Sequence, residues 1–148
     1  MKPAKVKNEG VVKDKVTKLL DAHKWFWFKP PANGYGRSGI ADILAVRGGV
    51  FIAIETKQTA KQEPSPMQRG FLNSVRAEGC FGFTVHQDNL KALEHWLNAF
   101  NVAVAHSSEG KEVPPEVGAI MLNCIAELMR DGKPVTLAAL DTEEMTKQ

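Results

Sequence analysis

The sequence predicts an α/β domain in which helices pack against one mixed sheet, with elements in the order α-β-β-β-α-β-α followed by a C-terminal helical extension. Two apolar runs, 40–46 and 50–54, flank Arg47-Gly48-Gly49, a pattern typical of an antiparallel hairpin. Apolar residues recur at helical spacing on both sides of this hairpin. The 148 residues, of which 43% are hydrophobic, suit one domain over 1–100 and an extension over 101–148.

The segment before the hairpin predicts a helix and then a strand. Residues 9–23 carry an apolar helical stripe formed by Val12, Val16, Leu19 and Leu20. Residues 24–29, Lys-Trp-Phe-Trp-Phe-Lys, have the aromatic content of a strand and stop at Pro30-Pro31. We expect these aromatic side chains to lie in the core rather than to serve as stacking platforms for bases.

The segment after the hairpin predicts helix, strand and helix. Ser65-Pro66 supplies an N-cap and a first-turn proline, and Gly79 ends the helix. Residues 80–85 form a strand-like apolar run, and a helical stripe follows at Leu90, Leu93, Leu97 and Phe100. Gln68 shares the apolar side of the first of these helices, so it needs either a polar partner at a site or a boundary position in solvent.

The C-terminal part predicts a linker over 101–113, an amphipathic helix over 115–130 and a short second helix over 136–140. The apolar stripe of the amphipathic helix contains Val117, Met121, Cys124 and Leu128. This stripe packs either on the domain's own body or on a second copy of the chain.

Charge divides unevenly along the chain. Residues 1–100 hold 15 basic and 9 acidic residues, a net of +6, whereas residues 101–148 hold 4 and 8, a net of −4. A basic body suits nucleic-acid binding, although solubilising charge is the simpler alternative. No membrane span or signal peptide is recognisable, and Cys80 and Cys124 are expected to be reduced core thiols. We therefore expect a cytoplasmic protein.

Three charged residues stand out on the hairpin. Asp42 lies in its first run, and Glu55-Thr56-Lys57 ends its second. Because strand side chains alternate, Glu55 and Lys57 share one face with Phe51 and Ala53. Carboxylates hold Mg²⁺, and a neighbouring lysine can hold water and stabilise developing negative charge, which suits phosphodiester hydrolysis. The alternative is an exposed edge strand that happens to end in Glu-x-Lys.

These residues also carry a family resemblance. The strings Gly-Ile-Ala-Asp (39–42), Phe-Ile-Ala-Ile-Glu-Thr-Lys (51–57) and Ser-Pro-Met-Gln-Arg-Gly-Phe-Leu (65–72) come in order and in the expected context. Over residues 9–97 the chain resembles the PD-(D/E)XK nucleases, which have a restriction-endonuclease-like core. Within them it is most similar to small VRR-NUC and Holliday-junction-resolvase-like domains, often found in phages. Ala41 stands where that family usually has proline.

The resemblance implies roles for particular residues. Asp42, Glu55, the Thr56 carbonyl and an early helical acid, here Glu9, would hold Mg²⁺ or Mn²⁺. Lys57 would assist the attacking water, and Gln68 would support the site. Glu9 has an equally good alternative, because a first-turn acid is favoured by the helix dipole.

A glycine-rich loop precedes Asp42. The string Gly-Tyr-Gly-Arg-Ser-Gly (34–39) matches a dinucleotide fingerprint, but it follows prolines instead of a strand, which disfavours that function. We expect Lys29, Tyr35 and Arg37 to contact substrate phosphates. The sequence thus predicts a metal-dependent endonuclease acting on branched or structured DNA, and a homodimer if both strands are cut symmetrically. A catalytically silent nucleic-acid binder, a partner-binding protein and an RNA-directed nuclease are the alternatives.

Overall fold

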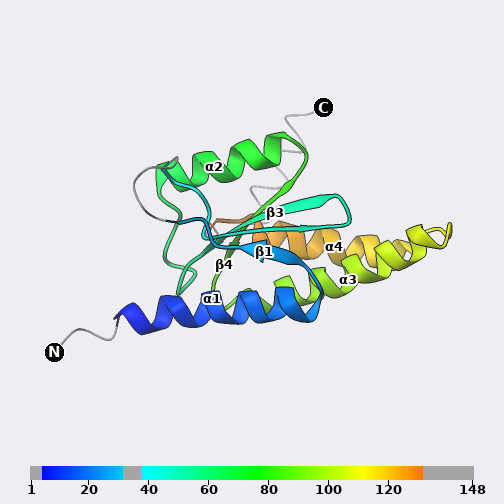
Figure 1. Cartoon of the computed structure of the whole chain (residues 1–148), viewed down its shortest axis with the longest axis horizontal. Coiled ribbons are helices and arrows are strands. Elements are labelled where there is room, and N and C mark those ends of the chain that lie inside the picture. The colour runs from blue at the N-terminus through cyan, green and yellow to red at the C-terminus, as the bar shows by residue number, and fades with distance from the viewer. Residues whose placement is uncertain (1–4, 32–37, 132–148) are drawn as a thin grey trace, which may run out of the picture.

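The structure is a computed structural model that describes residues 5–31 and 38–131, with side chains described from residue 10 onward. In this part of the chain, one four-stranded sheet is covered by helices on both faces (Figure 1). In chain order the elements are α1 (Lys5–Ala22), β1 (Phe26–Phe28), β2 (Ile43–Arg47), β3 (Val50–Thr56), α2 (Pro66–Ala77), β4 (Phe81–Val85), α3 (Leu90–Ser108) and α4 (Pro115–Leu128). The predicted α/β fold and its element order are confirmed.

The predicted hairpin is formed by β2 and β3, with Leu44 opposite Ala53. Its turn contains Gly48 and Gly49, whose φ angles are +57° and +79°. A two-residue turn of this kind needs positive φ at both positions, and glycine adopts it without strain. β1 pairs antiparallel with β2, and β4 pairs parallel with β3, so the sheet is mixed.

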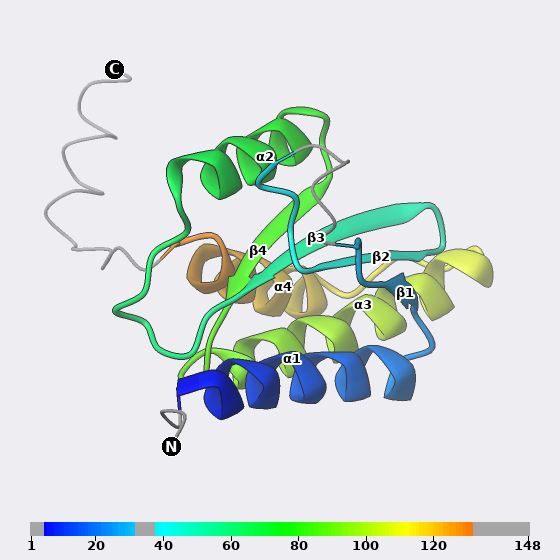
Figure 2. The same cartoon turned by 60° about the vertical axis from the view of Figure 1, so that its left-hand side comes forward.

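The two faces of the sheet are covered unequally. α1, α3 and α4 cover one face and enclose the main core, whereas α2 lies alone over the other face (Figure 2). On β3, Ile52 and Ile54 point into the main core, and Ala53 points toward Leu72 of α2. Glu55 therefore lies on the α2 side of the sheet, as the alternation of strand side chains requires.

α2 begins where the sequence predicts. The Ser65 hydroxyl oxygen accepts from the Gln68 backbone N–H (3.2 Å), and the Gln68 side-chain oxygen accepts from the Ser65 N–H (2.8 Å). This reciprocal capping box fixes the Gln68 side chain at the start of the helix. Gly39, with φ of +81°, lies against the same turn: a Cβ there would come within 2.6 Å of the Met67 carbonyl.

The aromatic segment is only partly in the core. Trp25 is buried between Trp96 and Phe100, with ring centroids at 6.0 and 4.9 Å. Phe26 and Phe28, however, are 71% and 46% exposed, so the expectation that these aromatics are core residues is wrong for both. The reason is that they point to the α2 side of the sheet, where α2 packs over β3 and β4.

The C-terminal part differs from its prediction in two ways. α3 continues to Ser108, so the predicted linker is wrong for residues 101–108; Val104 packs against the core and extends the apolar stripe. α4 turns its stripe onto the chain's own core, where Cys124 and Leu128 are buried and Met121 packs beside them. Three of the four stripe residues thus pack within the chain, whereas Val117 is not among the core residues. The helix predicted over 136–140 lies outside the described residues.

A buried ion pair attaches the end of α4 to the rest of the fold. Arg76 of α2 donates to both carboxylate oxygens of Asp131, at 2.8 and 2.9 Å. The Thr84 hydroxyl of β4 donates to the same carboxylate at 2.7 Å. The extension is thus bonded to the helix that carries Gln68.

No helix in the described residues is both long and apolar enough to cross a membrane.

Candidate active site

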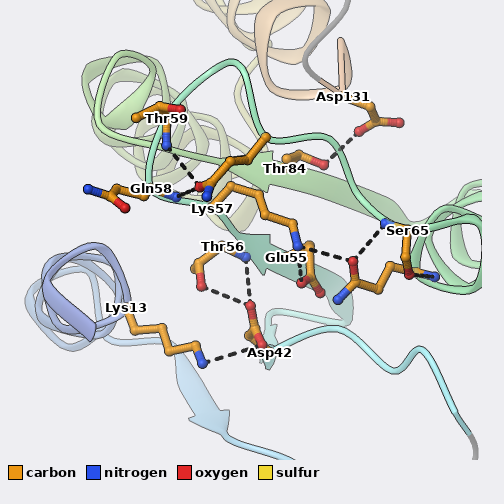
Figure 3. Close-up of polar contacts among 12 residues, drawn as sticks. Lys13, Asp42, Glu55, Thr56, Lys57, Gln58, Thr59, Ser65, Thr84 and Asp131 are labelled. Atoms are coloured by element: carbon orange, nitrogen blue, oxygen red, sulfur yellow. Dashed lines mark hydrogen bonds and ion pairs between the residues drawn. The ribbon is translucent and has the colours of Figure 1, made fainter. Parts of the chain in front are cut away.

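Asp42, Glu55 and Lys57 come together at one end of the β2–β3 hairpin, beside the start of α2 (Figure 3). Asp42 immediately precedes β2, Glu55 lies near the end of β3 and Lys57 follows it. The hairpin register places the start of β2 next to the end of β3, because Ile43 pairs with Ile54. The sequence prediction that these three residues would meet is therefore confirmed as geometry.

The Asp42 carboxylate is held in a fixed orientation. Its Oδ2 accepts from the Thr56 backbone N–H (2.9 Å) and from the Thr56 hydroxyl (2.8 Å). Charge-assisted hydrogen bonds of this kind stabilise the ionised carboxylate. The N–H and C=O of one strand residue point to the same side, so the Thr56 carbonyl also faces the Asp42 side of β3. Sequence reasoning gave Thr56 only its carbonyl role and missed that its hydroxyl orients Asp42.

Glu55 is the most unusual group of the site. Its side chain is 2% exposed, and no described group donates a hydrogen bond to its Oε2. The neighbouring Asp42 carboxylate can share a hydrogen bond with Glu55 only when one of the two carboxyls is protonated. Burial, followed by repulsion from the Asp42 carboxylate, raises the pKa of Glu55 from 4.5 to about 8, although the Lys57 ammonium opposes this shift. A carboxyl buried with one unpaired oxygen costs free energy that a cation bound to it would recover.

Lys57 links Glu55 to α2. Its ammonium lies 3.6 Å from Glu55 Oε1 and donates to Gln68 Oε1 at 3.2 Å (Figure 3). Because the same Gln68 oxygen accepts from the Ser65 N–H, the capping box of α2 also positions the lysine. The sequence left two alternatives for Gln68, a polar partner at the site or a boundary position in solvent. The structure decides for the first, with Lys57 as the partner.

Sequence reasoning missed Lys13. This residue of α1 places its ammonium 3.5 Å from Asp42 Oδ1, the carboxylate oxygen that Thr56 does not bind. A signal was present in the sequence, because Lys13 lies four residues after Glu9 and such positions share one helical face. A positive side chain thus approaches the carboxylates from α1 as well as from β3.

The structure leaves the roles of the other predicted site residues untested. Glu9 lies within α1, but its side chain is outside the described part of the chain, as are Tyr35 and Arg37 altogether. Lys29 is exposed and directly follows β1, the edge strand at the opposite side of the sheet from β4. The roles proposed for these four residues stay predictions.

The donor set fits a small divalent cation held by oxygen. Within the described side chains, no group of three or more acidic, histidine or cysteine residues gathers at one point. Among the described side chains, Asp42 and Glu55 are therefore the two carboxylates available at this point, and the Thr56 carbonyl is a third oxygen on the Asp42 side of β3. Mg²⁺ is commonly held by one or two carboxylates, with water and substrate phosphate completing its coordination. The unpaired, buried Glu55 oxygen is the observation that favours this fit.

Comparisons with known proteins identify the fold. A solved VRR-NUC domain superposes with a TM-score of 0.53 at 27% identity, covering 60% of this chain and 96% of that domain. A Holliday junction resolvase from Archaeoglobus fulgidus gives a TM-score of 0.43 at 18% identity, covering 52% of this chain and 66% of the resolvase, too distant to add to the argument. No protein-family model and no curated protein matches the sequence. The resemblance inferred from the motif is confirmed at the level of the fold: this chain has the PD-(D/E)XK-type nuclease fold of the VRR-NUC domain.

Proposed function

We propose that this protein is a metal-dependent endonuclease that hydrolyses phosphodiester bonds of branched or otherwise structured DNA. The observation that carries the proposal is the buried Glu55 carboxyl, which has an unpaired oxygen, a raised pKa, and Asp42 and Lys57 beside it. A purely structural carboxyl with these neighbours would destabilise the protein without compensation. A cation-binding role accounts for all three features.

Each residue has a distinct task in this function. Asp42, Glu55 and the Thr56 carbonyl would hold Mg²⁺ or Mn²⁺, which when bound would supply Lewis-acid polarisation of the scissile phosphate and a water of lowered pKa. Lys57 orients the attacking water and stabilises the negative charge that develops on the phosphate oxygens. Gln68 fixes the Lys57 ammonium, and Thr56 fixes Asp42. Lys13 is placed to meet a phosphate oxygen near Asp42.

The motif strings and the match to a VRR-NUC domain support a nuclease, and the basic body supports a nucleic-acid substrate. The preference for branched DNA rests on the resemblance to resolvase-like domains. Symmetric cutting of such a substrate requires two active sites, which a homodimer would supply. Because Met121, Cys124 and Leu128 of the α4 stripe pack on the chain's own core, we expect that contact to use mainly another surface.

The proposal is tested with single-stranded, duplex, flap and four-way DNA, each incubated with Mg²⁺, Mn²⁺ or chelator. We expect cleavage that chelator abolishes, and we expect Asp42→Asn and Lys57→Ala to abolish it while circular dichroism and Tm show an intact fold. The matched controls are Asp14→Asn and Lys61→Ala, which change the same residue types at exposed positions. Activity of the controls should remain at the wild-type level.

Three outcomes would contradict the proposal in different ways. Chelator-sensitive cleavage that survives in Asp42→Asn would show that Asp42 is not the metal ligand assigned to it. Binding of DNA without cleavage of any substrate would support a catalytically silent relative. Cleavage of RNA versions of the panel in preference to DNA would redirect the same chemistry to an RNA substrate.

A further inference from the structure

Two phenylalanines on the edge strand β1 are exposed in a way that the active-site chemistry does not explain. Phe26 and Phe28 lie side by side with ring centroids 6.5 Å apart, and Val46 beside them on β2 is 41% exposed. Large aromatic side chains are normally buried, because each removes some 150–250 Å² from water. We call Phe26, Phe28 and Val46 the edge patch.

The edge patch lies on the same face of the sheet as the Glu55 carboxyl, and Asp42 lies at the adjoining end of that sheet. Phe28 pairs with Leu44 and Leu44 pairs with Ala53, two residues before Glu55, so the side chains of Phe28 and Glu55 point to the α2 side of the sheet. Asp42 immediately precedes β2 and lies at the end of the sheet, where its carboxylate accepts from Thr56 and meets Lys13 of α1. One strand spacing and two residues along a strand separate Phe28 from Asp42 by about 8 Å. This corresponds to roughly two stacked nucleotides. A DNA strand whose phosphodiester bond is cut beside Asp42 and Glu55 would thus have the bases next to the cut over the edge patch.

We propose that the edge patch is a stacking platform for unpaired bases that flank the phosphodiester cut at the proposed active site. Exposed aromatics on an open sheet face are the means by which many proteins bind single-stranded nucleic acid, because every base has a face that can stack. Exposed Lys29 directly follows Phe28 and can meet the phosphate of a base stacked there. The inference rests on the proposed nuclease function and adds a preference for unpaired DNA near the cut.

A second copy of the chain is a less suitable occupant. The exposed area of the three side chains is only about 300 Å², taking the usual area of such residues. A stable protein interface buries about 800 Å² on each partner. The patch is large enough for one or two bases but supplies less than half of a dimer contact.

The test measures DNA binding in chelator, where no cleavage occurs. Fluorescence anisotropy compares a single-stranded oligonucleotide with the duplex of the same sequence, for wild type, Phe28→Ala, Phe26→Ala and Phe28→Tyr. We expect Phe28→Ala to weaken single-strand binding about 5- to 150-fold, the usual effect of losing one stacked base, and Phe28→Tyr to restore it. Duplex affinity should not change, because paired bases are not available to the patch.

The matched control is Leu122→Ala, which removes an apolar side chain from α4 that is 68% exposed, close to the 71% of Phe26. A 2-aminopurine placed in the single strand should lose fluorescence on binding wild type and keep more of it with Phe28→Ala. Equal weakening on single strand and duplex, or an effect no larger than that of Leu122→Ala, would overturn the platform. A switch from dimer to monomer in light scattering, with unchanged single-strand affinity, would assign the patch to a second copy instead.

The two proposals fail separately. If Asp42→Asn abolishes cleavage but Phe28→Ala leaves single-strand binding unchanged, the nuclease stands and the platform falls. If Phe28 governs single-strand binding but wild type cleaves nothing, the platform stands as a binding surface and the nuclease falls. If wild type binds no single-stranded DNA at all, the platform is overturned.

Discussion

Replacing Glu55 by glutamine should stabilise the metal-free protein, although it removes a proposed catalytic group. Glutamine has nearly the same shape and cannot ionise, so it escapes the cost of a buried carboxylate. The pKa of Glu55 rises from 4.5 to about 8 on folding, mainly through burial and then through Asp42. Below pH 4.5 the Glu55 carboxyl is protonated in both the folded and the unfolded chain, and the folded protein has its full stability. As the pH rises from 4.5 toward 8, the unfolded chain ionises more readily than the folded one, and the free energy of unfolding falls.

The size of the effect follows from linkage. Wild type should lose about 1.4 kcal/mol relative to Glu55→Gln for each pH unit between about pH 5 and pH 8. At pH 7 the difference amounts to roughly 3 kcal/mol, which for a chain of this size raises Tm by about 10 °C. The slope of this difference against pH reports the Glu55 carboxyl directly, because one titrating group gives about 1.4 kcal/mol per pH unit.

The assay is urea unfolding of wild type and Glu55→Gln in chelator at pH 5, 6, 7 and 8, with Glu112→Gln as the exposed control. Subtracting the two free energies removes the pH dependence of all other groups. Added Mg²⁺ should then raise the stability of wild type by RT ln(1 + [Mg²⁺]/Kd) and leave Glu55→Gln nearly unchanged. Metal binding should also release close to one proton at pH 7.

A difference between the two proteins that does not grow with pH would refute the reasoning, because it would mean that Glu55 is already ionised at pH 5. Destabilisation by Glu55→Gln at pH 7 would mean that the carboxylate has a partner that holds the fold together. Equal stabilisation of both proteins by Mg²⁺ would place the cation elsewhere.

Four further experiments test the packing of the fold and the binding of DNA. Arg76→Ala should cost about 3–5 kcal/mol in urea unfolding, because it leaves the Asp131 carboxylate buried without its partner; an effect below 1 kcal/mol would make the pair dispensable. Gly39→Ala should lower Tm and cleavage together, since its Cβ would collide with the Met67 backbone at 2.6 Å; wild-type values for both would contradict this. Truncation after Phe100 should give an insoluble or unfolded chain, because it cuts α3 and uncovers the core, and a folded monomer in gel filtration would disprove this. DNA affinity should fall steeply between about 50 and 200 mM salt, and a flat response in a binding titration would favour a protein partner.

Those parts of the fold and the site that depend on neighbouring residues are predictable from the local sequence. The two glycines of the β2–β3 turn, the capping box at Ser65 and the alternation along β3 are local constraints. Since the hairpin turn also sets the register, it brings Asp42 to Glu55 and Lys57 without any help from distant elements. The carboxylate pair and its lysine were therefore predictable from a span of sixteen residues, 42–57.

Which surfaces are covered depends on how whole helices and strands pack, and the local sequence does not predict it. The stripe of α4 is apolar whether it packs on its own core or on another chain. In the structure α4 packs against α3, and most of the stripe joins the chain's own core. Phe26 and Phe28 are of a residue type that is usually buried, but α2 packs over β3 and β4, so both side chains stay exposed on β1. Lys13 reaches Asp42 only because α1 crosses that end of the sheet. Burial and long-range contacts depend on how whole elements pack, and this information is spread over the chain rather than held in any one segment.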